Sequence, residues 1–221
     1  MTNNPFDLED ARARYETQLI QCWTGNEDGS HDIAHIRRVW RNAWTIAQGE
    51  TVQIDLQVLL PAVIFHDLIN LPKNAPDRHL ASAQSAGKAL SLLASEPLSP
   101  SQRDNIAHAI TAHSYSAGLP ARTVEARILQ DADRLDALGA IGVARSMYIA
   151  GRLNTQFYHP DDPLAQTREL DDTAYTLDHF PVKLFKLKDM MNTKTGRDMA
   201  QTRTAYMEDF RAMILAEAGL T

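Results

Sequence analysis

Four residues of this sequence have the types and the order that a divalent-metal site requires. His66 and Asp67 directly follow the apolar run at 58–65, which is typical of a helix buried on most sides. His35 lies in an earlier segment and Asp133 in a later one. Polar groups buried at such places must be hydrogen-bonded, paired or bound to metal, because leaving them unsatisfied costs several kcal/mol. Two imidazoles and two carboxylates form a donor set that suits Mn, Fe, Co, Ni or Zn better than calcium.

Each of these residues also has a purely structural interpretation. The His-Asp dipeptide occurs at 31–32 as well as at 66–67, so the dipeptide alone is weak support for a site. Taken singly, His35 is expected to be a hydrogen-bonded helix residue and Asp133 a solvated one. A metal site requires that all four side chains lie close together in the folded protein. Their spacing in the sequence does not show whether they do.

The elements that must position these residues are predicted to be helices, because most of the chain repeats its apolar residues every 3.6 positions. In the helix expected at 31–48, Ile36, Val39 and Ala43 share one apolar arc, and His35 lies at the edge of that arc. The chain is therefore predicted to be all-α. Further helices are expected at 6–23, 53–68, 77–95, 99–113, 122–138, 141–151, 182–191 and 196–218.

Two features interrupt the helical pattern. Pro61 lies within the helix expected at 53–68 and must either kink it or mark a late start. The turn-rich stretch 154–176 carries two prolines and repeated aspartates. We interpret this stretch as an insertion or lid, with an ordinary surface loop as the alternative.

Composition excludes several classes of protein. The 221 residues include 28 acidic and 22 basic side chains, a formal net charge of −6, and 44% hydrophobic residues, which is typical of globular proteins. The longest apolar run is far shorter than the about 20 residues of a bilayer-spanning helix, and the N-terminus does not resemble a secretory signal. The single cysteine fits a reducing compartment. We therefore expect a cytoplasmic protein with one domain over 1–221 that binds neither membrane nor nucleic acid.

The order of the four residues, with Asp133 in the segment ADRL, resembles the HD-domain metal-dependent phosphohydrolase superfamily. The match is closer to a branch of small bacterial HD hydrolases whose known members include nucleotide pyrophosphohydrolases. The segments that carry the resemblance are SHDIAHIRRVW (30–40), FHDLINLPKNAPDRHLAS (65–82), AHSYSAG (112–118), ILQDADRLDALGAIGVAR (128–145) and LDHFPVKLFKLKDMMNTKTGRDMAQTR (177–203).

This resemblance implies an all-α HD core at about 30–150 and a C-terminal helical extension at about 177–218. It implies a small phosphorylated substrate such as a nucleotide and one divalent metal ion. The sequence does not distinguish Mn, Mg, Co, Ni, Fe and Zn, although we favour Mn or Mg. The implied reaction is hydrolysis of a phosphate ester or anhydride by metal-activated water, as in a nucleoside triphosphate pyrophosphohydrolase. The implied metal ligands are His35, His66, Asp67 and Asp133.

Negative charge that develops on phosphate oxygens during such a reaction needs positively charged partners. His31 could orient His35 or relay a proton. Some members of the superfamily place a glutamate three residues after the His-Asp pair, where this chain has Asn70, so their proton-transfer scheme does not carry over directly. The candidate substrate-binding residues are Lys73, Arg78, His113, Arg145 and Lys183. The candidate catalytic residues are Asp67, His31, Lys73 and Arg78.

Two other functions fit the same residues. Some HD-fold proteins hold two irons and oxidise small molecules by means of additional histidine ligands. His113, which shares a helix face with Ile106 and Ile110, is the candidate for such a ligand. The third possibility is a non-catalytic module that binds a nucleotide. A homodimer is compatible with all three.

Overall fold

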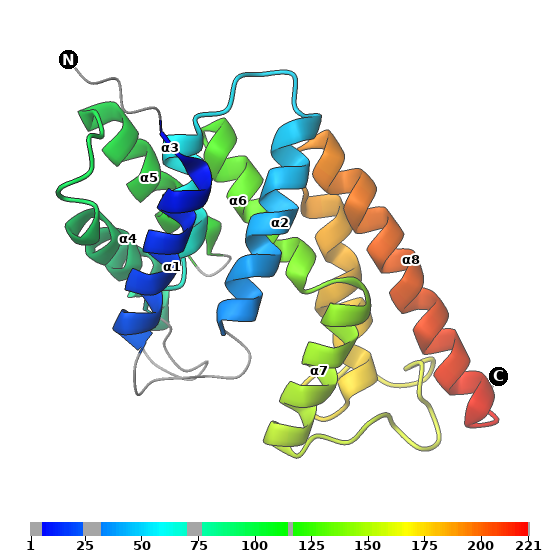
Figure 1. Ribbon diagram of the computed structural model, residues 1–221. Coiled ribbons are helices and arrows are strands. Elements are labelled where there is room, and N and C mark those ends of the chain that lie inside the picture. The colour runs from blue at the N-terminus through cyan, green and yellow to red at the C-terminus, as the bar shows by residue number, and fades with distance from the viewer. Residues whose placement is uncertain (1–5, 24–31, 70–76, 115–116, 221) are drawn as a thin grey trace. The chain divides into compact units, whose positions relative to one another are not determined.

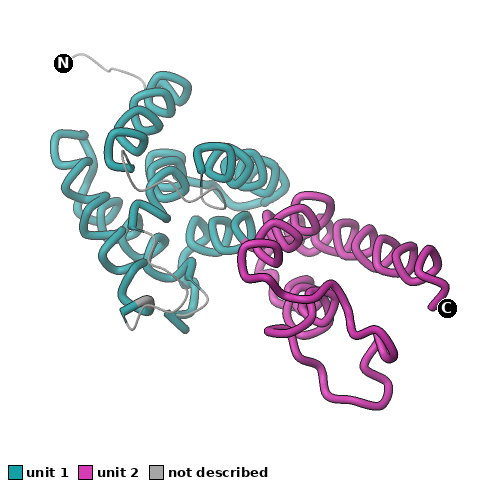
Figure 2. The backbone as a smooth tube through the Cα atoms, turned by 90° about the horizontal axis from the view of Figure 1, so that it is seen from below, with its two compact units in different colours: residues 1–133 teal, residues 134–221 magenta. Residues whose placement is uncertain are grey.

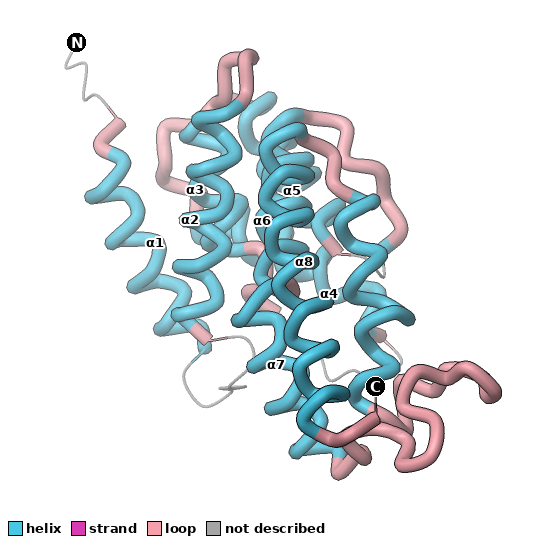
Figure 3. The backbone as a smooth tube through the Cα atoms, turned by 90° about the vertical axis from the view of Figure 1, so that its right-hand side faces the viewer, coloured by secondary structure: helices cyan, strands magenta, loops and turns pink. Residues whose placement is uncertain are grey.

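Helices account for the regular structure of this chain, and the predicted all-α fold is confirmed. No β-strand occurs among the residues that the structure covers, where a single isolated bridge joins Gln156 to Tyr175 (Figure 3). Among those same residues, none of the helices has both the length and the hydrophobicity needed to cross a membrane. The computed structural model (Figure 1) describes residues 6–23, 32–69, 77–114 and 117–220.

The chain divides into two compact units, residues 1–133 and 134–221 (Figure 2). The expectation of one domain over the whole chain stays a prediction. The first unit contains α1 (Leu8–Trp23), α2 (Ile33–Gly49), α3 (Leu56–Phe65), the short η1 (Arg78–Leu80), α4 (Ala81–Leu92), α5 (Pro100–His113) and most of α6 (Val124–Asp136). The second contains α7 (Gly139–Leu153), η3 (Thr176–Asp178), η4 (Phe180–Leu184), η5 (Phe185–Met190) and α8 (Lys194–Glu217).

Helix α3 is the centre of the first unit. It packs against α1, α2, α4 and α5, and every residue from 58 to 65 is buried. Pro61 lies inside this helix, which begins at Leu56, so the alternative of a late helix start is wrong. Proline has no N–H to donate to the carbonyl of Gln57, one turn earlier. The buried helix ends at Phe65, and the chain therefore delivers His66 and Asp67 at the edge of the core.

Carboxylates at the starts of α2 and α6 accept hydrogen bonds that hold these helix ends in place. The Asp32 carboxylate accepts a hydrogen bond from the backbone N–H of His35, at 2.8 Å, and so caps α2. The buried Glu125 carboxylate, in the first turn of α6, accepts from the backbone N–H of Asp55 at 3.0 Å and from the Asn105 amide at 2.9 Å. These bonds tie the start of α6 to the start of α3 and to α5.

The second unit begins with a tight connection between α6 and α7 that depends on two glycines. Gly139 has φ +71°, and a Cβ there would lie 3.2 Å from the Arg203 side chain. A Cβ on Gly142 would clash with the carbonyl oxygen of Ala137. The helix predicted at 182–191 is present in another form, as the π-helical η4 followed by the 3-10 helix η5.

The loop between α7 and η3 (Figure 3, loops in pink) is held together by two aspartates, Asp162 within the loop and Asp178 in η3. Asp162 accepts from the backbone N–H groups of Gln166 and Thr167, each at 2.8 Å, and these bonds lower its pKa to about 2. The buried Asp178 accepts two hydrogen bonds from Arg168, at 2.6 and 2.9 Å. The loop is therefore an ordered element, and its role as a lid stays a prediction.

Candidate metal centre

The first unit brings together two histidines and an aspartate in an arrangement that could hold a metal ion. His35 comes from the first turn of α2, and His66 and Asp67 follow α3. The Nε2 atoms of the two histidines lie 3.4 Å apart. Oδ2 of Asp67 lies 3.7 Å from Nε2 of His35 and 3.5 Å from Nε2 of His66.

Asp133 reaches the same cluster from α6. Its Oδ1 lies 3.6 Å from Nε2 of His35 and 3.8 Å from Nε2 of His66. The imidazoles are buried, at 1% and 0% exposed, whereas the side chains of Asp67 and Asp133 are 18% and 30% exposed. The cluster is therefore closed on its histidine side and open to solvent on its carboxylate side.

The hydrogen bonding of His66 shows which of its two ring nitrogens directs a lone pair toward the cluster. Its Nδ1 lies 2.7 Å from the carbonyl oxygen of Val63, which can only accept, so the hydrogen is on Nδ1. Burial lowers the pKa of His66 and favours the neutral ring. In the neutral ring Nε2 then directs a lone pair toward His35 and the carboxylates. Metal-binding histidines are commonly oriented in this way by a backbone carbonyl.

His113, the last residue of α5, also lies in the cluster. Its Nε2 is 3.5 Å from Oδ1 of Asp67, and its ring meets that of His66 edge-on, with the centroids 4.8 Å apart. Burial lowers the pKa of His113, but the hydrogen bond and negative charge of Asp67 raise it by more, so the net shift is upward. His108, on the same helix, has a different role, because its Nε2 accepts from the backbone N–H of Arg122 at 3.0 Å.

Two buried amide side chains hold the helices of the cluster together. Asn42 lies two turns after His35 on α2 and donates to the carbonyl of Ala132, beside Asp133, at 3.0 Å. Gln130 on α6 donates to the carbonyl of Ala112, beside His113, at 2.9 Å. Neither residue is among the site residues predicted from the sequence. The available signal was that Asn42, seven residues after His35, lies on the same face of its helix.

We expect the substitution Asn42→Leu to weaken metal binding as well as stability. It leaves the carbonyl of Ala132 without the amide of Asn42, at a cost of about 1–3 kcal/mol in the free energy of unfolding. It also loosens the backbone beside Asp133, which we expect to lower divalent-metal affinity about 10-fold. Urea unfolding and isothermal titration with Mn²⁺ measure the two effects.

The matched control for this prediction is Thr45→Val on the same helix. The Thr45 hydroxyl donates to the carbonyl of Arg41, at 3.0 Å, on the exposed side of α2. Its loss should leave Mn²⁺ affinity unchanged. If Asn42→Leu lowered stability without weakening Mn²⁺ binding, Asn42 would support the fold alone.

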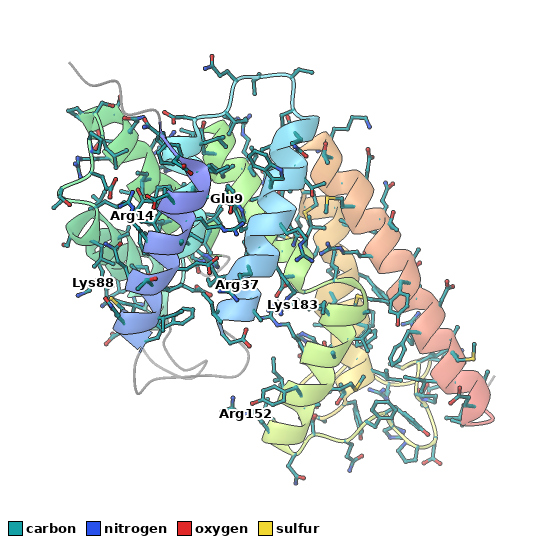
Figure 4. All side chains as sticks on the ribbon, in the orientation of Figure 1. Glu9, Arg14, Arg37, Lys88, Arg152 and Lys183 are labelled. Carbon is teal, nitrogen blue, oxygen red and sulfur yellow. The ribbon has the colours of Figure 1, made fainter. Side chains whose placement is uncertain are left out.

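The structure does not test several of the predicted site residues. His31, Asn70 and Lys73 lie outside the described residues, as does the side chain of Arg78. Arg145, in α7 of the second unit, forms an ion pair with the buried Asp136 at 2.7 Å. Lys183, labelled in Figure 4, is exposed on η4. The roles assigned to these residues stay predictions.

A known protein family matches a segment of this chain that includes the whole cluster. The family model described as HD domain matches residues 32–138. Among curated proteins, YpgQ of Bacillus subtilis (strain 168) is 33% identical over 203 residues, which cover 88% of this chain and 90% of YpgQ. The similarity therefore extends well beyond the residues around the cluster.

Solved structures are also similar to this chain well beyond the residues around the cluster. An HD-superfamily hydrolase from Bacillus thuringiensis is similar with a TM-score of 0.75 at 27% identity, covering 97% of this chain and all of its own. The structure of Bacillus subtilis YpgQ in complex with ADP is similar with a TM-score of 0.70 at 28% identity, covering 95% of this chain and 96% of YpgQ. These similarities extend over both units of the chain.

Proposed function

Because this chain belongs to the HD-domain superfamily, we propose that it is a divalent-metal-dependent phosphohydrolase that acts on a nucleotide. The observation that carries the proposal is the cluster of His35, His66 and Asp67, with Asp133 beside it. The similarity of this chain to a solved HD-superfamily hydrolase supports the proposal that it is a hydrolase. The ADP complex of YpgQ, a protein similar over nearly the whole chain, supports a nucleotide as the substrate.

In this proposal each of the four residues has a distinct task. His35 and His66 supply nitrogen donors from the buried side of the cluster, and the carbonyl of Val63 keeps His66 in the required orientation. Asp67 and Asp133 supply negative charge on the side that is open to solvent, which is where a phosphate substrate would enter. When bound there, a divalent ion lowers the pKa of its water and withdraws electron density from the phosphate.

The ligand set favours a transition metal over calcium, because calcium takes six to eight oxygen donors and rarely accepts imidazole. We propose Mn or Mg as the physiological ion. Lys73, Arg78, Arg145 and Lys183 are proposed to offset negative charge on the substrate, and His31 to assist proton transfer. Cleavage between the α and β phosphates of a nucleoside triphosphate is the proposed reaction.

The test is a screen of the purified protein against nucleoside mono-, di- and triphosphates with Mn²⁺, Mg²⁺, Co²⁺ and Ni²⁺. Release of pyrophosphate from a triphosphate supports the full proposal, whereas release of phosphate assigns a nucleotidase or phosphatase. Nucleotide binding without turnover under any of these ions would instead indicate a non-catalytic module. Two irons per chain together with oxygen consumption would assign an oxidase and overturn the proposal.

A further inference from the structure

The Asp67 carboxylate lies between His113 on one side and the pair His35 and His66 on the other. We infer that His113 is a positioning residue: it holds Oδ1 of Asp67 so that Oδ2 faces His35 and His66. This inference rests on the proposed metal site, since it concerns how one of the proposed ligands is presented.

The two oxygens of Asp67 face different partners. Oδ2 lies 3.5 Å from Nε2 of His66 and 3.7 Å from Nε2 of His35, whereas Oδ1 lies 3.5 Å from Nε2 of His113. A carboxylate with contacts to one oxygen alone can still rotate about its terminal bond, because that torsion is broad. Partners on both oxygens fix the plane of the group. His113 thus does for Asp67 what the carbonyl of Val63 does for His66.

His113 can perform this task because two contacts hold its ring and a third bond holds the backbone beside it. Its Nδ1 donates to the carbonyl of Ile110 at 2.6 Å, and its ring lies edge-on against His66. The amide of Gln130 binds the carbonyl of Ala112, immediately before it, so the end of α5 is tied to α6. His113 is also 8% exposed, which leaves the ring little room to turn into solvent.

The expected consequence is on metal affinity. Residues that orient a metal ligand without binding the ion typically change affinity about 10–100-fold when they are replaced. Asp67 needs such support more than either imidazole does, since its side chain is 18% exposed and water competes for its oxygens.

Three variants of the full-length protein separate the contacts that His113 makes. In His113→Gln the amide nitrogen reaches the position of the imidazole Nε2, so the contact with Asp67 is retained and the bond to Ile110 is lost. In His113→Asn the amide nitrogen replaces Nδ1, so the bond to Ile110 is retained and the contact with Asp67 is lost. His113→Phe keeps the ring against His66 and loses both polar contacts. Mn²⁺ affinity is measured by isothermal titration after metal removal, alongside thermal unfolding.

We expect His113→Gln to bind Mn²⁺ nearly as tightly as the wild type, and His113→Asn and His113→Phe to bind it about 10–100-fold more weakly. The control His108→Gln, on the same helix, should bind Mn²⁺ like the wild type. Retention of affinity in His113→Asn or His113→Phe would overturn the inference, because the bond to Ile110 or the ring packing would then suffice.

The spectrum of the Co²⁺-loaded wild type tests whether His113 is itself a ligand. We expect two coordinated imidazoles, His35 and His66, and three would overturn the positioning role. Failure of the inference is distinguishable from failure of the proposed function. A wild type that binds none of the four divalent ions contradicts the proposed function, whereas a wild type that binds Mn²⁺ with unaffected His113 variants contradicts the inference alone.

Discussion

Asp67→Asn is expected to weaken divalent-metal binding severely and to slow hydrolysis with it. The substitution keeps the size of the side chain but removes one of the two negative charges that face the ion, and a neutral amide is a poor ligand in that position. Loss of an activated water and of charge compensation removes about 4 kcal/mol of transition-state stabilisation, which corresponds to a rate about 1,000-fold lower. Metal content and the turnover of the best nucleotide substrate are the measurements.

Stability provides a second readout that does not depend on activity. A ligand that binds the folded state alone stabilises it by about 2.7 kcal/mol at a concentration 100-fold above its dissociation constant. The wild type should therefore unfold at a higher temperature when Mn²⁺ is added, and Asp67→Asn should not. Asp104→Asn, an exposed change on α5, is the control and should behave like the wild type. Full turnover at unchanged metal stoichiometry would remove Asp67 from the ligand set.

The helices and the core could be predicted because they depend on local pattern. The arc of Ile36, Val39 and Ala43 on α2 is fully buried, as the 3.6-residue period requires. The same rule placed His113 with Ile106 and Ile110 on one face of α5, and that face is buried. The 3.6-residue period shows which side of a helix faces the core, and this is sufficient to predict that these residues are buried.

The partners of these faces could not be predicted in the same way. His35 is expected at the edge of an apolar arc, yet it is 1% exposed, and His66 and Asp67, which follow α3, lie against that edge. Asn42 and Gln130 bind backbone carbonyls of neighbouring helices, and a carbonyl leaves no signal in the sequence. The sequence of a helix thus indicates that a buried polar side chain needs a hydrogen-bond partner. Which group is the partner depends on how the helices pack.

Phe65→Ala is expected to have the second large effect, because the metal site depends on the packing of the core behind it. Phe65 is fully buried at the end of α3, with its ring 5.5 Å from that of Tyr15 on α1, and it immediately precedes His66. Removing the ring should cost about 3–5 kcal/mol in the free energy of unfolding, a large share of the about 5–15 kcal/mol available to a domain. The end of α3 would then shift toward the cavity, so Mn²⁺ affinity should fall as well.

Phe65→Leu separates the cavity from the loss of the aromatic ring. Leucine fills most of the space, so it should cost no more than about 1.5 kcal/mol and leave Mn²⁺ affinity close to that of the wild type. Urea unfolding followed by circular dichroism and Mn²⁺ titration of the folded fraction measure both quantities. Equal metal affinity in wild type and Phe65→Ala would mean that the bond from His66 to the carbonyl of Val63 holds the imidazole in place without the packing behind it.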